Sequence, residues 1–277
     1  MSKVKENKKF NEEEANWDYA ELWDKFPVPA RPSVEELQYL ENEIKPLGKD
    51  AKVLILGSTI EYRALCKKLN ISPYVADFDE SIYKVLTSYS KEGFINEHFI
   101  EVDWLEIDDE DKYDVILGHR GPNVIGRDML GRFFQRLHKS LKSGGVFYSK
   151  SNIRFANDTD SLEKLIDKWA FADDRKYPLF SYIETELYIH CADDAGYVDY
   201  PKARKLAKGW LDDKRIKSED YDLIKILISL SSESRFRGLI YDDEMKKAIS
   251  TAHFVNSEWM ILDKDICSNM PIIKMTK

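Results

Sequence analysis

The sequence predicts a doubly wound, Rossmann-like α/β fold built on a mainly parallel sheet. Short apolar runs alternate with helical stretches between residues 51 and 150, which is typical of this fold. The run at residues 53–56 is continuously apolar and ends at Gly57, as expected of a strand buried on both faces of a sheet. The chain has 277 residues, of which 43% are hydrophobic, so it can form one large domain with a substantial insert.

Two helices precede the first strand, and together they predict an N-terminal helical cap over residues 1–48. The first helix is expected at residues 11–26, before a short segment that contains three prolines. The second helix begins after Ser33, and Glu36 stands three residues later, as in a capping box. The sequence Pro46-Leu47-Gly48 ends it.

Residues 49–155 predict the Rossmann-like core. Strands are expected at residues 53–56, 74–76, 99–102, 113–117 and 145–148, and helices at 61–69, 80–90 and 127–141. The last helix meets the last strand at Gly144 and Gly145, which predict a sharp turn.

The remaining chain predicts an insert and a return to the sheet. Residues 156–250 are mostly helical in pattern, with an amphipathic helix at 160–170 and charged helical stretches after residue 201. We expect this insert to form a substrate lid. Apolar runs at 259–262 and 271–275 then predict a β-hairpin over residues 251–277 that completes the sheet.

Composition narrows the classes of partner. The formal net charge of −8 argues against nucleic acid as the main partner, because phosphate binding needs a basic surface. No apolar stretch of about 18 residues occurs, so we expect a cytoplasmic protein that does not enter membranes. Cys66, Cys191 and Cys267 are widely spaced, so neither a disulfide framework nor a metal site is expected. The oligomeric state stays open, with a homodimer as one alternative.

The residues after the first predicted strand are candidates for ligand binding. Gly57, Ser58 and Thr59 open directly onto a helix, at the strand end where ligands bind in open α/β sheets. A glycine lets the backbone approach a ligand, and a helix N-terminus offers free N–H groups. The alternative is that Gly57 only forms a tight turn.

Acidic residues end the next two predicted strands. Asp77 stands 20 positions after Gly57, where a carboxylate accepts hydrogen bonds from ribose hydroxyls. Asp103 and Trp104 follow the third strand and suit an adenine ring, which stacks on an indole and donates from its amine. The alternatives are a helix cap at Asp77 and a turn with a packing tryptophan at Asp103 and Trp104.

From residue 51 to about 150 the chain resembles the class I S-adenosylmethionine-dependent methyltransferase superfamily. The glycine loop, ribose acid, adenine acid, fourth strand and Gly-Gly turn follow in the family's order, and the loop LGSTIEY is similar to that of a subgroup that reads LGxTPE. One departure is that the loop has a single glycine where the family usually has two or three. The resemblance implies S-adenosyl-L-methionine as cofactor, held by Gly57, Ser58, Thr59, Asp77, Phe78, Asp103 and Trp104.

Two further positions are candidates for the site. The N-terminal segment that contains Tyr19 and Trp23 resembles a helix that caps the cofactor in related enzymes, although aromatic residues at helical spacing often pack in a core. His119 follows the fourth strand and is the candidate general base, because an imidazole titrates near neutral pH. Alternatively, His119 contacts the cofactor or orients its loop, and the loop itself offers no acidic partner for the ring.

These features predict a methyltransferase that acts on an oxygen or nitrogen of a small-molecule acceptor. Aromatic residues and a histidine of the insert are candidates for lining the acceptor pocket: Tyr182, Tyr188, His190, Tyr197 and Tyr200. A non-catalytic S-adenosylmethionine-binding partner subunit is one alternative. A nicotinamide-dependent dehydrogenase is another, and it is disfavoured because residues 57–62 supply only the first glycine of GxGxxG.

Overall fold

The computed structural model describes residues 23, 25–90, 93–94, 96–156, 161–170, 177–231, 236–262, 266 and 269–277. In these residues a seven-stranded sheet has the order β3-β2-β1-β4-β5-β7-β6. The strands are β1 (Val53–Leu56), β2 (Tyr74–Asp77), β3 (His98–Glu101), β4 (Tyr113–His119), β5 (Leu141–Lys150), β6 (Asn256–Met260) and β7 (Ile272–Thr276). Strands β1 to β5 are parallel, whereas β7 runs antiparallel to both of its neighbours. The predicted doubly wound α/β fold is confirmed.

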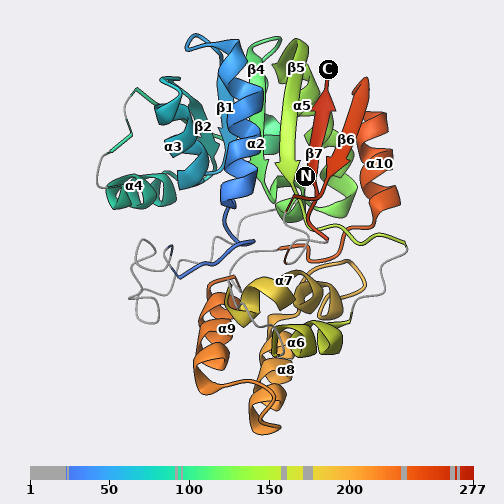
Figure 1. Cartoon of the computed structure of the whole chain (residues 1–277). Coiled ribbons are helices and arrows are strands. Elements are labelled where there is room, and N and C mark those ends of the chain that lie inside the picture. Colours follow the sequence, from blue (N-terminus) through green and yellow to red (C-terminus); the bar gives the residue numbers. More distant parts are fainter. Residues whose placement is uncertain are drawn as a thin grey trace, which may run out of the picture.

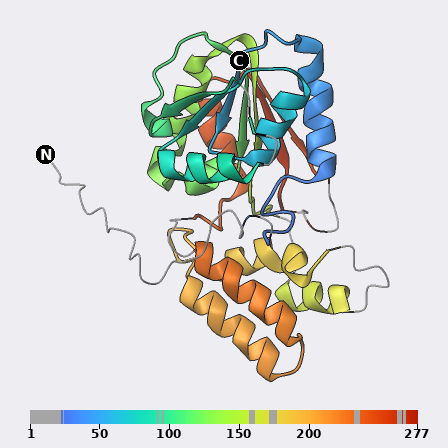
Figure 2. The same cartoon turned by 90° about the vertical axis from the view of Figure 1, so that its left-hand side faces the viewer.

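Helices cover both faces of the sheet (Figures 1 and 2). One face packs on α2 (Val34–Ile44) and α3 (Ile60–Lys68), and the other packs on α5 (Leu130–Ser140) and α10 (Asp242–Thr251). Successive residues of β1 point to opposite faces, so that Val53 packs with α2 and Leu54 packs with α5. A strand that contributes to two cores has to be apolar throughout, which explains the continuous run at residues 53–56.

Four helices form a separate bundle with its own core: α6 (Leu162–Ala170), α7 (Leu179–His190), α8 (Tyr200–Asp212) and α9 (Ser218–Ser231). Trp169, Leu187 and Trp210 are buried in that core. Figure 1 shows the bundle beyond one end of the sheet. This is the carboxyl end of the parallel strands, because Arg120, just after β4, pairs with Glu184 of α7.

Helix α10 differs from the expectation for residues 156–250, which placed it in the helical insert. Its buried residues Met245 and Ile249 join the core between the sheet and α5. The structure therefore limits the separate bundle to α6 through α9. The apolar stripe of α10 predicts a buried helix, but it does not indicate which of the two cores buries it.

The edge strand β6 also differs from its prediction. The apolar run at residues 259–262 predicted the strand, but the pairing with β7 begins at Asn256 and ends at Met260. Strand β6 lies at the edge of the sheet, and Asn256 and Glu258 are exposed. An edge strand that faces solvent needs no continuous apolar run. The apolar run at residues 259–262 therefore does not mark the limits of β6.

The part of the chain that the structure describes can be compared with the expectations for membrane helices and cysteines. No helix there is both long and apolar enough to cross a membrane. Cys66 and Cys191 are free and buried, and Cys267 lies outside the described residues. Most of the expected first helix, including Tyr19, also lies outside them.

Gly144 and Gly145 lie within β5, which begins at Leu141 directly after α5, and not in a turn before the strand as predicted. The register between β4 and β5 shifts at this point, and the shift depends on a close backbone approach. A Cβ atom at Gly145 would lie 2.9 Å from the Lys142 carbonyl oxygen and 3.0 Å from that of Tyr113. Backbone atoms cannot move aside as a flexible side chain does, so only glycine fits there without distortion.

We therefore expect Gly145→Ala to lower the free energy of unfolding by about 1–3 kcal/mol, as other overpacked sites do. Gly209→Ala is the matched control, because nothing lies within 4 Å of a Cβ at this position in α8. The control is expected to raise stability by about 0.5–1 kcal/mol through helix propensity. Urea unfolding of both variants checks the signs, and a stable Gly145→Ala protein would contradict the packing argument.

Candidate functional site

The glycine loop lies against the ends of two neighbouring strands. Gly57 has a φ of +81°, which favours glycine, and its N–H donates to the Ala76 carbonyl at 2.8 Å. The Ser58 hydroxyl donates to the Asp77 carboxylate at 2.7 Å. Thr59 is buried and precedes the first residue of α3. The loop after β1 and the acid that ends β2 therefore form one cluster.

Asp77 is a buried carboxylate at this edge of the sheet. Burial raises the pKa of Asp77, whereas the Ser58 hydroxyl and the N–H groups of Asp79 and Phe78 oppose that rise by stabilising the ionised form. The next side chain, Phe78, is 70% exposed, which is unusual for a large apolar ring. An acceptor of hydrogen bonds thus stands beside an exposed apolar ring.

The Trp104 ring packs beside the glycine loop. Its indole N–H donates to the Ala76 carbonyl at 2.8 Å, and its ring would lie 3.5 Å from a Cβ at Gly57. Asp103 is exposed, and its side chain accepts from the Leu105 N–H at 2.9 Å, which caps the short 3₁₀ helix Trp104–Glu106. The structure thus gathers the candidates from the ends of β1, β2 and β3 along one edge.

The segment before α2 passes over the same edge. The Trp23 indole N–H donates to Glu61, in the first turn of α3, at 3.3 Å, and Arg31 pairs with the same carboxylate at 2.6 Å. Phe26 packs against the core of the α6–α9 bundle. This segment therefore contacts both the helix of the glycine loop and the bundle. Tyr19 lies outside the described residues.

His119 directs both ring nitrogens at protein groups. Its Nε2 lies 3.1 Å from the Pro29 carbonyl oxygen, and since a carbonyl only accepts, Nε2 carries the hydrogen. Its Nδ1 lies 3.5 Å from the carboxylate of Glu36, and the side chain is 7% exposed. This geometry favours the alternative in which His119 orients the loop after β4, rather than its use as a base.

Glu36 is the acidic partner that the loop itself lacks. The predicted start of α2 is confirmed, because the Ser33 hydroxyl accepts from the Glu36 N–H at 3.1 Å. The capping-box assignment of the Glu36 side chain is wrong. Its carboxylate turns inward, accepts from the Tyr62 hydroxyl and pairs with Lys150 at 3.1 Å. Lys150 is buried at the end of β5 and requires a counter-charge there.

The electrostatics of this cluster favour an ionised Glu36. Burial raises its pKa, but Lys150, His119 and the Tyr62 hydroxyl outweigh burial, so that the pKa lies well below its ordinary value of 4.5. Burial and the nearby Glu36 carboxylate raise the pKa of Tyr62. The phenol therefore stays protonated and donates to Glu36.

Two further ion pairs join the carboxyl edge to α7, and the sequence pattern predicts neither of them. Arg120 binds Glu184 through two contacts of 2.8 and 2.6 Å, and Arg154 binds Glu186 at 3.0 Å. Asn269, which precedes β7, also donates to Glu186. The partners lie far apart in the sequence, so no local spacing indicates them.

The aromatic candidates of the insert have different environments. Tyr188 and Tyr200 are buried in the bundle core, with ring centroids 6.1 Å apart. Tyr182 packs against Met270 near the sheet edge, whereas His190 is exposed. Tyr197, the remaining candidate, is half-buried. Packing therefore explains Tyr188 and Tyr200 without a ligand.

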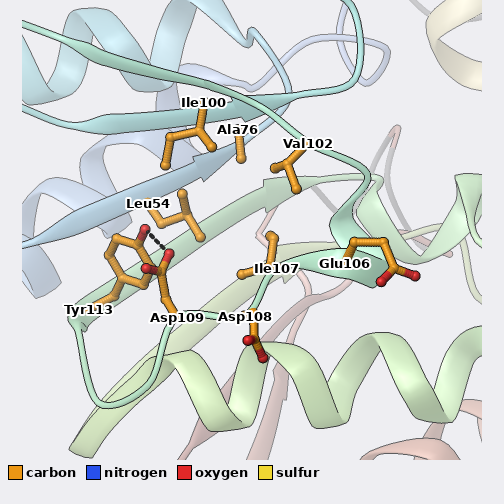
Figure 3. Close-up of a pocket in the computed structure, with 9 residues that line it drawn as sticks. All are labelled: Leu54, Ala76, Ile100, Val102, Glu106, Ile107, Asp108, Asp109 and Tyr113. Atoms are coloured by element: carbon orange, nitrogen blue, oxygen red, sulfur yellow. Dashed lines mark hydrogen bonds between the residues drawn. The ribbon is translucent and has the colours of Figure 1, made fainter.

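A cavity of about 320 Å³ is lined by residues of β1, β2 and β3 and by the segment that follows β3 (Figure 3). Apolar side chains of β1, β2 and β3 line it, among them Leu54, Ala76 and Ile100. The segment from β3 to β4 crosses this face with only a short 3₁₀ helix, which leaves the strands partly uncovered. The cavity contains none of the predicted site residues, although Ala76 directly precedes Asp77.

No protein-family model matches the chain, and no curated protein matches its sequence. Solved structures are similar in fold. A proposed S-adenosyl-L-methionine-dependent methyltransferase from Methanococcus maripaludis has a TM-score of 0.53 at 16% identity, over 100% of this chain and 97% of that one. A proposed zinc-dependent alcohol dehydrogenase from Rhodobacter sphaeroides has a TM-score of 0.52 at 14% identity, over 95% and 98% of the two chains.

A proposed O-methyltransferase from Nostoc punctiforme has a TM-score of 0.50 at 14% identity, over 87% of this chain and 55% of that one. Methyltransferases of the class I fold are thus among the structural neighbours. At such low identities the similarity establishes the fold, which the dehydrogenase shares. The chemistry has to be argued from the residues at the edge.

We expect Glu36→Gln to lower the free energy of unfolding at pH 7 by about 3–5 kcal/mol, because the buried Lys150 ammonium loses the charge of its partner at 3.1 Å. Glu41→Gln is the matched control on the same helix. Its partner Lys68 is 64% exposed, so the expected loss is about 0–1 kcal/mol. Equal stability of the two variants by urea unfolding would contradict the role given to Glu36.

The pH dependence follows from the same residue. A carboxyl with a lowered pKa stabilises the folded chain above its unfolded value of 4.5, and that stabilisation is lost as the pH falls further. Wild-type stability should therefore fall more steeply below about pH 4.5 than that of Glu36→Gln. Parallel stability curves for the two proteins would contradict this assignment.

Proposed function

We propose that the chain is an S-adenosyl-L-methionine-dependent methyltransferase that acts on an oxygen or nitrogen of a small-molecule acceptor. The observation that carries the proposal is the cluster of Gly57, Ser58 and Asp77 at the carboxyl ends of β1 and β2. Ligands of open α/β sheets bind at this edge. The fold similarity to a methyltransferase over the whole chain supports the same conclusion.

The residues at the edge suit the chemical groups of this cofactor. Asp77 would accept from the ribose hydroxyls, while Gly57, without a Cβ, leaves room for the cofactor beside the backbone. Asp103 would accept from the adenine amine, and Trp104 and Phe78 offer flat apolar surfaces. When bound, the cofactor supplies an electrophilic methyl group on its sulfonium.

The chain's own contribution is mainly positioning. Methyl transfer is an in-line displacement, in which alignment of the acceptor supplies much of the rate. The α6–α9 bundle would hold the acceptor and exclude water. His119 acts as a positioning residue, because Glu36 and Pro29 fix its ring and with it the loop after β4.

Tyr62 argues against the dehydrogenase alternative. Residues 57, 59 and 62 correspond to the three glycines of GxGxxG, and the third of these lets helix and strand pack closely. Here that position is Tyr62, which is 2% exposed and donates to Glu36. The loop thus lacks the close backbone approach that a dinucleotide pyrophosphate requires.

Calorimetry with the two cofactors tests the class of ligand. We expect S-adenosylmethionine or S-adenosylhomocysteine to bind with a micromolar Kd, and NAD to give no measurable heat of binding. Tighter binding of NAD would contradict the proposal.

Asp77→Asn should weaken S-adenosylhomocysteine binding by about 1–3 kcal/mol, because the ribose hydroxyls lose a charged acceptor. Asp79→Asn is the matched control: it removes the same charge two residues away, at a half-buried residue that caps α4 (Glu80–Tyr89). Asparagine caps a helix as well as aspartate does, so the control should bind normally. Equal affinities would place the ribose elsewhere.

Formation of S-adenosylhomocysteine tests whether the chain is an enzyme. We expect it to accumulate when the protein is incubated with S-adenosylmethionine and a suitable alcohol, amine or amide. Binding of the cofactor without turnover on any compound of these classes would favour a non-catalytic cofactor-binding subunit.

A further inference from the structure

Asn152 lies two residues beyond β5, at the carboxyl edge of the sheet, and its side chain makes no hydrogen bond to any residue that the structure describes. The residue is fully buried, and neither its Nδ2 nor its Oδ1 has a partner among the residues that the structure describes. A buried amide without partners costs free energy, because it has lost its bonds to water. Such a group in a folded chain requires a specific explanation.

Asn123, in the loop after β4, shows the opposite pattern. Its Nδ2 donates to the carbonyls of Asn152 and Arg237, at 3.2 and 2.8 Å, and its Oδ1 accepts from the Asn152 N–H at 3.0 Å. These hydrogen bonds fix the position of the Asn152 backbone. Among the described residues, the Asn123 amide thus has several hydrogen-bond partners, whereas the Asn152 amide has none.

The backbone defines the direction of the Asn152 side chain. Beyond β5 the antiparallel ladder continues, because the Ser151 N–H donates to Pro271 and the Ile153 N–H donates to Asn269. Side chains alternate along an extended strand, so Asn152 shares a side with Lys150 and Arg154. Lys150 pairs with α2, and Arg154 pairs with Glu186 of α7. Asn152 therefore projects toward α2 and α7.

Helix α7 contributes two buried hydroxyls, those of Ser181 and Thr185. Ser181 and Thr185 are one turn apart, so they lie on the same face of the helix. Both are buried, and within the described part of the chain neither hydroxyl has a hydrogen-bond partner. Thr185 stands between Glu184 and Glu186, which pair with the carboxyl edge of the sheet.

The ionic groups of this region are matched with one another. Arg120 pairs with Glu184, Arg154 with Glu186, and Lys150 with Glu36. Asn152, Ser181 and Thr185 add an amide and two hydroxyls that have no hydrogen-bond partner among the described residues, and these three groups are neutral. Because the charges named above are paired with one another, a neutral polar ligand suits these groups better than a charged ligand does.

We propose that Asn152, Ser181 and Thr185 recognise the methyl acceptor, and that the acceptor presents a neutral carboxamide or lactam edge. This inference rests on the proposed methyltransferase function. An asparagine amide offers a donor and an acceptor side by side, and a lactam offers the complementary pair. Because these groups are buried in this structure, acceptor entry requires α7 to move away from the sheet.

Thermal unfolding of two variants tests whether the Asn152 amide lacks partners. Asn152→Leu should keep or raise the Tm, since it removes polar atoms that bond to nothing. Asn123→Leu is the matched control and should lower the Tm, since it breaks bonds to Asn152 and Arg237. Equal losses in the two variants would show that ordered water or protein satisfies Asn152, and would overturn the inference.

Binding of 2-pyridone, a small lactam, tests the recognition itself. In the presence of S-adenosylhomocysteine we expect 2-pyridone to bind the wild-type chain at least about tenfold more tightly than 2-methoxypyridine, which has no N–H. Asn152→Leu should lose this preference and keep its affinity for S-adenosylhomocysteine. No binding of 2-pyridone, equal binding of the two compounds, or an unchanged preference in the variant overturns the acceptor site. Failure of the wild type to bind S-adenosylhomocysteine overturns the proposed function instead.

Discussion

The ion pair between Lys150 and Glu36 joins the end of β5 to α2 at a place from which water is excluded. Removing two charges from water is costly unless the partners meet in good geometry and their other polar atoms are bonded. Tyr62 from α3 and His119 from β4 supply those contacts. One buried carboxylate thereby fixes the relative positions of two helices and two strands at the carboxyl edge of the sheet.

The same constraint extends to the bundle and to the site. Arg120 follows β4 and Arg154 lies beyond β5, and each pairs with a buried glutamate of α7. These pairs align α7 with the edge where Gly57 and Asp77 meet. A bundle attached through paired charges has a defined docking position, which is what alignment of an acceptor with a methyl donor requires. The neutral groups Asn152, Ser181 and Thr185 are those that we propose to recognise the acceptor.

The parts of the fold that local pattern determines were predictable from the sequence. Strand β1 is buried on both faces and therefore apolar throughout, and Asp77 stands at the end of a strand that its neighbours define. Glu36 was misassigned, because its spacing from Ser33 satisfies a capping box while its true partner, Lys150, is remote in sequence. The position of α10 was missed for a similar reason, since an apolar stripe does not say which core buries it. Asn152 carries no sequence signal, because its importance lies in having no hydrogen-bond partner among the residues that the structure describes.

A crystal structure of the full chain grown with S-adenosylhomocysteine tests the central claim most directly, because it reports where the cofactor lies and what Asp77 binds. We predict that the ribose hydroxyls lie against the Asp77 carboxylate, with the adenine beside Asp103 and Trp104. We also predict that Glu36 still pairs with Lys150 in that structure. Cofactor density away from the ends of β1 and β2, with Asp77 bonded only to Ser58 as it is here, would contradict the account.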